Sequence, residues 1–391
     1  VTRQYTRCVV AKVALFSPQT VEWQIMKIDG PLRLATRGST LAQRQTAAVQ
    51  DRLADRRHSV EQVIIETTGD QIRDELIHQL GKAGAVVRAL DEAVLEGEAD
   101  AAVHSMKDMP TEQPSSLIIA GVPPRAAAGD VLVTPGGDSL EELPAGAVIG
   151  TASTRRRAQV YAERSDIEVA PLRGNIDTRV EKLLAPSLQR EHERRMEAEE
   201  ENDEQGERDD ETETAYEETV DEWFNSLSEL ERRALERAVE TEYDAIVLAE
   251  AGLARSNLLE MVPHTQLDPH HFVPAPGQGA VAVTTDEDAD CVERIHSVVD
   301  HPQTRVETTV ERTILATLGG GCIAPIGVYA VLKGDQIRAV VRVLSADGET
   351  EVYESKDLPV ENHATAAVSF ADDLAERGAA TLIEDATEAT T

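Results

Sequence analysis

Cysteine is scarce in this chain, with 3 residues among 391. So few thiols cannot form the disulfide framework of a secreted domain, and we expect a protein of the reducing cytoplasm. No apolar run approaches the roughly 20 residues that a membrane span needs. Residues 1–27 contain no secretory cleavage site,. Because the clear pattern begins only near Leu32, we expect translation to start at Met26, with the upstream residues an artefact of gene prediction.

Basic residues are also few: there are 38 Lys and Arg against 72 Asp and Glu, which gives a net charge of −34. Such a charge disfavours nucleic acid and anionic membranes, and we expect neither as a partner. Excess carboxylate suits concentrated salt, where the Debye length falls to about 3 Å and self-repulsion is screened. The acidity extends to residues 286–290 and 384–388. This spread favours a halophilic protein over an ordinary protein with one acidic segment.

Two kinds of ligand motif are missing from the sequence. No Cys and His spacing predicts a metal site, and no glycine-rich loop matches a dinucleotide or P-loop pattern. The chain instead alternates short apolar segments with segments of helical periodicity, which is typical of α/β domains. The expected strands are residues 32–36, 63–66, 101–104, 131–134, 148–150 and 243–248, and the expected helices are 41–54, 84–96 and 153–164.

A segment dominated by Glu and Asp, residues 186–222, interrupts this alternation. Blocks of like charge with few apolar residues usually stay solvated and often disordered. We expect a flexible surface insertion without a catalytic role, closed by a short amphipathic helix through Leu227, Leu230 and Leu235.

The last third of the chain begins with a Pro- and Gly-rich stretch, residues 274–279, that predicts an interdomain crossover,. Beyond residue 302 we expect a helix, then strands such as 337–344, and a final helix over 364–378. These elements predict a small α+β domain.

Six arginines lie near the predicted strand ends. A guanidinium binds carboxylates bidentately and stays charged, and loops at strand carboxyl ends are where open α/β sheets bind ligands. Neighbouring Gly, Ser, Thr and Asn residues add hydrogen-bond donors. The pattern therefore favours a polycarboxylate ligand over surface salt bridges. The six are Arg37, Arg155, Arg156, Arg173, Arg179 and Arg255.

Two further motifs suggest chemistry. Lys107 and Asp108 follow the predicted strand 101–104, where such a pair can bind an anion and manage a proton or a cationic intermediate; a salt-bridged turn is the alternative,. For His104 in the same motif we expect a structural role as a hydrogen-bonded residue. Cys322 follows a run of three glycines, so its thiol can approach a ligand as a nucleophile or covalent anchor,. The alternative for Cys322 is a small buried residue.

Seven motifs, in this order, resemble the hydroxymethylbilane synthase family, also called the porphobilinogen deaminase family. The resemblance covers residues 32–385 outside the acidic insertion. The motifs are Leu-Arg-Leu-Ala-Thr-Arg-Gly-Ser from residue 32, Ala-Val-His-Ser-Met-Lys-Asp-Met-Pro from 102, Gly-Thr-Ala-Ser-Thr-Arg-Arg from 150, Leu-Arg-Gly-Asn-Ile-Asp-Thr-Arg from 172, Tyr-Asp-Ala-Ile-Val-Leu-Ala from 243, Pro-Gly-Gln-Gly-Ala from 276 and Gly-Gly-Gly-Cys-Ile-Ala-Pro-Ile-Gly from 319.

The resemblance implies an α/β fold of three domains: two lobes like those of periplasmic binding proteins and a small α+β C-terminal domain. It also implies a monomer that hands its product to uroporphyrinogen-III synthase. The implied extents are residues 31–124 with 280–300 for domain 1, 125–279 for domain 2 with the acidic insertion at 186–240, and 301–391 for domain 3.

The activity implied by the resemblance is that of a transferase. Such an enzyme deaminates porphobilinogen, joins four molecules head-to-tail onto a covalent dipyrromethane cofactor, and releases the linear tetrapyrrole hydroxymethylbilane by hydrolysis. Loss of ammonia gives a cationic azafulvene, which the free α-position of the bound chain attacks. Cys322 is the implied thioether anchor of the dipyrromethane.

The resemblance also assigns residues. Each pyrrole unit carries two carboxylates, which matches the many cations, and Asp108 is placed beside the pyrrole nitrogens to stabilise the azafulvene. The implied catalytic residues are Asp108, Lys107 and Arg37. The implied cofactor-binding residues are Cys322, Asp108, Lys107, Ser105, Thr151, Ser153, Arg155, Arg156 and Arg173. The implied substrate-binding residues are Arg37, Ser39, Arg173, Asn175, Arg179, Arg255 and Gln278.

The sequence departs from the family at residues 81–86, where Lys82 is shifted and Val86 stands where an aromatic is common. This departure puts an aromatic cover over the growing chain in question. A non-catalytic bilobal organic-anion-binding protein is the alternative of a different class, but it predicts neither the Cys322 loop nor Lys107 and Asp108. Another Cys-dependent transferase would need a Cys–His pair, and none is evident.

Overall fold

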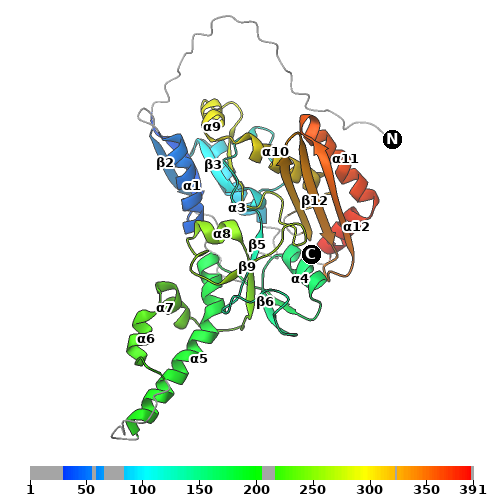
Figure 1. The fold of residues 1–391 in the computed structure, drawn as a ribbon. Coiled ribbons are helices and arrows are strands. Elements are labelled where there is room, and N and C mark those ends of the chain that lie inside the picture. The colour runs from blue at the N-terminus through cyan, green and yellow to red at the C-terminus, as the bar shows by residue number, and fades with distance from the viewer. Residues whose placement is uncertain (1–29, 55–58, 66–82, 205–215, 322–323, 389–391) are drawn as a thin grey trace, which may run out of the picture.

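Three β-sheets organise the protein in the computed structural model, which describes residues 30–54, 59–65, 83–204, 216–321 and 324–388 (Figure 1). Two sheets have five strands each and the third, C-terminal sheet has three. The predicted fold class, two α/β lobes with a small α+β domain, is confirmed.

The sheet of the first lobe has the strand order β2-β1-β3-β10-β4. Strand β10 runs antiparallel to β3 and β4, whereas β1 is parallel to β2 and β3. Because helices cover both faces, the central strands are apolar on both sides. The strands are β1 (Leu32–Arg37), β2 (Val60–Ile65), β3 (Ala101–Ser105), β4 (Leu117–Gly121) and β10 (Val281–Asp286). Helices α1 (Thr40–Leu53) and α9 (Val292–Val299) share one core, and α3 (Ala83–Leu95) belongs to another.

The second lobe repeats this topology with the strand order β7-β6-β8-β5-β9. Here β5 is the inserted strand, antiparallel to both β8 and β9. In each lobe the antiparallel strand directly follows a crossing from the other lobe. The strands are β5 (Asp130–Val133), β6 (Val148–Gly150), β7 (Glu168–Ala170), β8 (Ala245–Ala249) and β9 (His264–Gln266). The helices are α4 (Thr154–Glu163), α5 (Ile176–Glu204), α6 (Val220–Ser226), α7 (Glu229–Leu235) and α8 (Glu250–Arg255).

The C-terminal part packs helices on a three-stranded antiparallel sheet. Its core includes Ile314, Val341 and Phe370, each at most 1% exposed. Helix α12 was not predicted. The elements are α10 (Pro302–Thr317), β11 (Ile326–Lys333), β12 (Gln336–Leu344), β13 (Glu351–Pro359), η3 (Val360–Asn362), α11 (His363–Glu376) and α12 (Ala379–Glu388).

The chain crosses between the lobes twice, through residues 122–129 and 267–280, and the two crossings touch. The Ala126 N–H donates to the Gly279 carbonyl at 3.1 Å. Gly279 has a φ of +84°, and a Cβ there would lie 2.5 Å from the Ala126 carbonyl oxygen. Only glycine fits this contact. The predicted crossover at 274–279 lies within the second crossing.

The prediction of a flexible acidic insertion is wrong for the described part of that segment. Helix α5 runs for 29 residues, passing Pro186, and α6 and α7 lie beside it as an arm that projects from the second lobe (Figure 1). Trp223 is 8% exposed, stacks on His192 with ring centroids 6.0 Å apart, and lies under the Arg195 guanidinium at 5.1 Å. A small apolar and aromatic core therefore orders the arm despite its charge. The predicted amphipathic helix is confirmed in part: α7 contains Leu230, which is buried, and Leu235, whereas Leu227 caps the end of α6.

Candidate active site

Lys107 and Asp108 lie in the one-turn helix η2 (Met106–Asp108) directly after β3. Met106, 1% exposed, anchors this turn in the core, and its N–H donates to the Ala280 carbonyl at 3.1 Å. With Met106 held inside, Lys107 is half-buried and Asp108 is exposed. The buried strand thus presents both side chains at its carboxyl end, where α/β sheets bind ligands.

The second lobe presents its own polar residues at the equivalent place after β6. Thr151 is buried, and its Oγ1 accepts a hydrogen bond from the Ser153 N–H at 3.2 Å. Ser153 is the N-cap of α4, its Oγ accepting from the Arg156 N–H at 3.4 Å. This cap fixes the start of α4 and places Arg155 and Arg156 in its first turn, 4% and 5% exposed,.

Asp130 is the partner of both arginines, and sequence reasoning missed it. The carboxylate is fully buried on β5; its Oδ2 accepts from Arg155 Nη2 at 2.7 Å and its Oδ1 from Arg156 Nη2 at 2.7 Å. Burial alone would raise the pKa of Asp130, but attraction to the two guanidinium groups outweighs it and holds that pKa far below its usual range,. An acidic residue opening an apolar strand was the available signal, since such a residue needs a buried cation.

Backbone carbonyls and Gln278 complete this cluster. Arg155 Nη1 donates to the Val273 carbonyl at 2.7 Å, and Arg156 Nη1 donates to the Val247 carbonyl at 3.0 Å. Gln278, 1% exposed, donates from Nε2 to Asp130 Oδ1 at 2.9 Å. Three of the predicted ligand-binding residues thus already have partners inside the protein.

Charges from the two lobes act on one another across the site. Burial lowers the pKa of Lys107 to about 8; Asp108 opposes this shift, and repulsion from Arg156 adds to it. The pKa of Arg179 falls to about 10, first through burial and then through repulsion from Arg156, with Asp108 again opposing. Lys107 and Asp108 come from the first lobe, whereas Arg156 and Arg179 come from the second. The structure therefore brings these four predicted residues together.

Three of the predicted arginines form no salt bridge with any acidic residue that the structure describes: Arg173, Arg179 and Arg255. Arg179 Nε donates to the Gly174 carbonyl at 2.8 Å, and Arg255 Nη2 donates to the Gly279 carbonyl at 2.7 Å. Burial lowers the pKa of Arg255. Partly buried guanidinium groups without a carboxylate partner, in so acidic a protein, are suited to an external anion.

The remaining predicted residues lie at element ends. Ser105 ends β3 and Arg37 ends β1. Ser39 is the N-cap of α1, its Oγ accepting from the Ala42 N–H at 3.3 Å. Asn175 Oδ1 accepts from the Thr178 N–H at 2.8 Å at the start of α5. These capping hydrogen bonds fix the positions of Ser39 and Asn175.

Some predictions fall outside the described residues: Cys322, Lys82 and the side chain of Val86. Cys291, which is described, lies buried in the first lobe, where burial raises the pKa of its thiol. Within the described ranges, no group of three His, Cys, Asp or Glu side chains could hold a metal ion. Nor is any helix there both long and apolar enough to span a membrane.

Two α/β lobes of one topology, with cations from both lobes and a further C-terminal sheet, define a bilobal α/β protein. The chain belongs to the porphobilinogen deaminase family. The family model "Porphobilinogen deaminase, dipyromethane cofactor binding domain" matches residues 32–190 and 228–294. The model "Porphobilinogen deaminase, C-terminal domain" matches residues 306–377. The resemblance inferred from the motifs is thereby confirmed.

Similar proteins cover nearly the whole chain. A protein of Halobacterium salinarum named "Probable porphobilinogen deaminase" is 52% identical over 387 residues, covering 91% of this chain and 98% of the relative. One of Methanococcoides burtonii with the same name is 38% identical, covering 90% and 96%. A "Porphobilinogen deaminase" of Campylobacter fetus is 34% identical, covering 91% and 99%.

The family model leaves residues 191–227 unmatched. This range contains the outer half of α5 and all of α6. Most of the projecting arm is therefore an addition to the family's shared domain.

Proposed function

We propose that this protein is a hydroxymethylbilane synthase, a transferase that deaminates porphobilinogen, joins four molecules head-to-tail and releases the linear tetrapyrrole by hydrolysis. The observation that carries the proposal is the convergence of Lys107 and Asp108 from one lobe with Arg156 and Arg179 from the other. Family membership and relatives named porphobilinogen deaminase support it.

The cations of the site bind the carboxylates of the substrate and of the growing chain. Arg173, Arg179 and Arg255 form no salt bridge with a described carboxylate, and Arg179 and Arg255 donate to backbone carbonyls, so their charge is available to an external anion,. Arg37, Ser39, Asn175 and Gln278 complete the substrate-binding set in this proposal. Gln278 contributes through the position of the second crossing, because its amide already binds Asp130.

A dipyrromethane cofactor fits this donor set, because two linked pyrroles bring four carboxylates and two N–H groups to a site rich in cations with one exposed carboxylate. When bound, it supplies the free α-carbon to which the first substrate is joined. We propose Cys322 as its attachment point. The other residues proposed to hold it are Ser105, Lys107, Asp108, Thr151, Ser153, Arg155, Arg156 and Arg173.

Asp108 and Lys107 have opposite tasks. The exposed Asp108 carboxylate accepts from a pyrrole N–H and stabilises the positive charge that develops as ammonia leaves the substrate. Lys107, with a pKa of about 8, is protonated at neutral pH and binds a substrate carboxylate. Arg37, at the end of the neighbouring strand β1, is proposed to help hold the reacting unit in place.

Asp108→Ala tests this mechanism. We expect kcat for porphobilinogen consumption to fall by about 100-fold or more, as when one electrostatic stabiliser of a transition state is removed. The circular dichroism spectrum should stay unchanged, because Asp108 is exposed. Turnover near that of the wild type would remove Asp108 from the mechanism.

Intact mass tests the cofactor and the enzyme class together. Wild-type protein should carry an excess equal to two linked pyrrole units, and Cys322→Ser should lack it. Cys291→Ser is the matched control and should keep the excess, because that thiol is buried in the first lobe. No excess in any of the proteins, even after incubation with porphobilinogen, would favour a non-catalytic organic-anion-binding protein.

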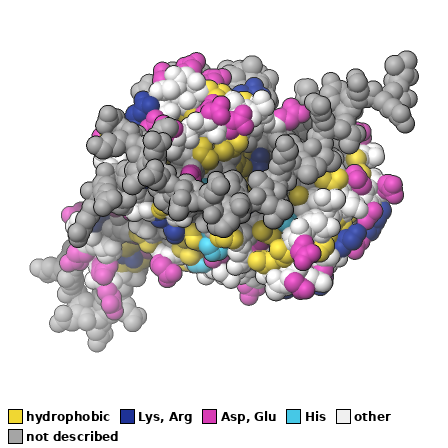
Figure 2. Space-filling view, turned by 90° about the horizontal axis from the view of Figure 1, so that it is seen from above, with side chains coloured by type: hydrophobic (Ala, Val, Ile, Leu, Met, Phe, Trp, Pro, Cys, Tyr) yellow, Lys and Arg dark blue, Asp and Glu magenta, His cyan; other side chains and the backbone are white. Residues whose placement is uncertain are grey.

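The proposal extends to the location, oligomeric state and salt adaptation of the protein. We propose a cytoplasmic monomer, adapted to concentrated salt, that hands its product to a uroporphyrinogen-III synthase. Asp and Glu side chains are scattered over the whole face seen in Figure 2, which supports the adaptation to salt. The proposed domains are residues 31–124 with 280–300, 125–279 with the insertion at 186–240, and 301–391.

A further inference from the structure

We propose that Arg312, on helix α10 of the C-terminal part, is a positioning residue that holds the Lys107–Asp108 turn in its working geometry. This inference rests on the proposed function. Arg312 Nη1 donates to the Met109 carbonyl at 3.3 Å, and Nη2 donates to the Pro110 carbonyl at 2.8 Å. These carbonyls belong to the two residues that directly follow Asp108. One guanidinium thus fixes the exit of the turn.

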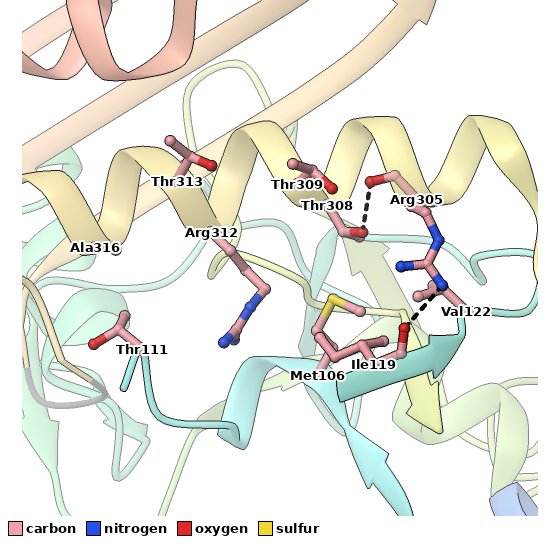
Figure 3. Close-up of a pocket in the computed structure, with 10 residues that line it drawn as sticks. All are labelled: Met106, Thr111, Ile119, Val122, Arg305, Thr308, Thr309, Arg312, Thr313 and Ala316. Carbon is pink, nitrogen blue, oxygen red and sulfur yellow. Dashed lines mark hydrogen bonds between the residues drawn. The ribbon is translucent and has the colours of Figure 1, made fainter. Parts of the chain in front are cut away.

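A cavity lies beside the hydrogen bonds that Arg312 makes to the turn. It has a volume of about 240 Å³ and lies between α10 and the segments that carry Met106 and Thr111. In Figure 3 the Arg312 side chain extends from α10 into the space between those two residues. Since close packing is interrupted there, the Arg312 hydrogen bonds contribute more to the distance between α10 and the turn than they would in a close-packed interface.

The residue before Arg312 holds the other side of the turn. Glu311 is fully buried, and its Oε2 accepts from the Gly277 N–H at 2.6 Å. Gly277 approaches Met106 so closely that a Cβ on the glycine would lie 2.9 Å from Met106 Cγ. Two consecutive residues of α10 therefore act on the turn. Arg312 binds the residues that follow Asp108, and Glu311 binds Gly277, which packs against Met106 at the start of the turn. Helix α10 ends at Thr317, shortly before the segment that contains Cys322.

Arg312→Ala removes both hydrogen bonds and leaves two carbonyls without this donor. We expect the turn to shift, so kcat should fall by about 10-fold to 100-fold, as for a misplacement of about 1 Å in reacting groups. KM should change less, because the cations that bind the substrate carboxylates lie mostly in the second lobe. Arg312→Lys should recover part of kcat, since an ammonium can reach one carbonyl but lacks the planar fork.

Arg305 provides a matched control on the same helix and the same cavity. Its Nη2 donates to the Ile119 carbonyl of β4 at 3.1 Å and its Nε to Asp300 at 2.7 Å, so these hydrogen bonds join α10 to the first lobe and not to the turn (Figure 3). Arg305→Ala should lower the free energy of unfolding, because it removes these two hydrogen bonds, and leave kcat within about twofold of the wild type, because neither of them holds the Lys107–Asp108 turn,.

Chemical rescue separates positioning from general stability. Millimolar guanidinium chloride should restore a large part of kcat in Arg312→Ala, because the ion fits the enlarged cavity and can donate to the same carbonyls. It should not act on Arg305→Ala. If Arg312→Ala does not fold, Arg312→Gln takes its place, with the same expected kcat loss. Equal kcat in the Arg312 and Arg305 variants, or absence of rescue in the Arg312 variant, would overturn the inference. An inactive wild type would instead refute the proposed function.

Discussion

Replacing Asp130 with Asn changes one charge at the centre of the candidate site and almost nothing in shape. In the wild type, Oδ1 accepts from Arg156 and Gln278 while Oδ2 accepts from Arg155. An asparagine presents one oxygen and one NH2 group, so one of these donors meets another donor. Two guanidinium groups then stay buried without an anion.

The loss in the free energy of unfolding follows from the burial of these charges. Breaking a buried ion pair by removing one partner costs about 3–5 kcal/mol, because the remaining charge loses its compensation. Asp130 is fully buried and both arginines are about as inaccessible, at 4% and 5% exposed, so solvent cannot replace the carboxylate. We therefore expect Asp130→Asn to lose about 3–5 kcal/mol in the free energy of unfolding.

The pH dependence of the free energy of unfolding tests separately whether the charge on Asp130 stabilises the fold. The pKa of Asp130 is lower in the folded protein than in the unfolded chain, so its stabilisation is complete above about pH 4 and is lost as the pH falls below that value,. The difference between wild type and Asp130→Asn should stay constant between about pH 5 and 8 and shrink below about pH 4.

Chemical denaturation followed by circular dichroism measures this difference. Asp373→Asn is the control, because Asp373 pairs with Lys356 at 2.8 Å with both side chains about half exposed, and exposed pairs contribute at most about 1 kcal/mol,. A loss in Asp130→Asn no larger than in the control would refute the claim that Asp130 neutralises the two arginines.

Three other predictions use activity. KM for porphobilinogen should rise above about pH 8, where Lys107 loses its proton, and Lys107→Arg should lack this rise,. Dilution into low salt should lower activity, because unscreened carboxylates repel one another and expand the fold; full activity without salt would contradict adaptation to salt. Replacing residues 191–227 with a short Gly-Ser linker should leave kcat unchanged, since the arm projects from the second lobe outside the family match; lost activity in a folded variant would assign the arm a role.

Local signals made much of the fold predictable. The strand at 148–150 and the helix after it were predicted correctly because an apolar run ends at Gly150 and Ser153 provides the helix cap. Strand β10 was missed although Val281–Asp286 begins with an apolar run, because its position between β3 and β4 depends on pairing with residues far away in the chain. No local pattern specifies that insertion.

Charge misled the prediction for the arm. Two capping boxes, Thr219 with Glu222 and Ser228 with Glu231, are visible in the sequence and announce the starts of α6 and α7,. The acidic composition of the segment nevertheless favours a flexible insertion. What orders the arm is tertiary contact, including Trp223 with His192 and Arg195 and the buried Leu230 of α7, and such pairing cannot be counted from composition.

The types of residue in the candidate site were predictable, but their pairing was not. Arginines at strand ends indicated an anion site, and Lys107 and Asp108 indicated a reaction. The pairing of Asp130 with Arg155 joins residues 25 positions apart on different elements. Sequence alone therefore treated Arg155 as a ligand contact of the same kind as Arg173, whereas in the structure Arg155, like Arg156, already has an internal carboxylate partner.

The buried Asp130 carboxylate offsets the effect of the neighbouring arginines on the pKa of Lys107. Arg155 and Arg156 both lower the pKa of Lys107, and Asp130 raises it, so Asp130→Asn should move the alkaline rise in KM to lower pH. Salt should act differently on the exposed surface carboxylates and on the buried cluster of Asp130, Arg155 and Arg156. Exposed carboxylates are screened within a Debye length, whereas buried partners are screened far less. Raising the salt concentration should therefore increase the free energy of unfolding while leaving the pH of the KM rise in place. A KM rise that moved with salt would show that surface charge, not the buried cluster, controls Lys107.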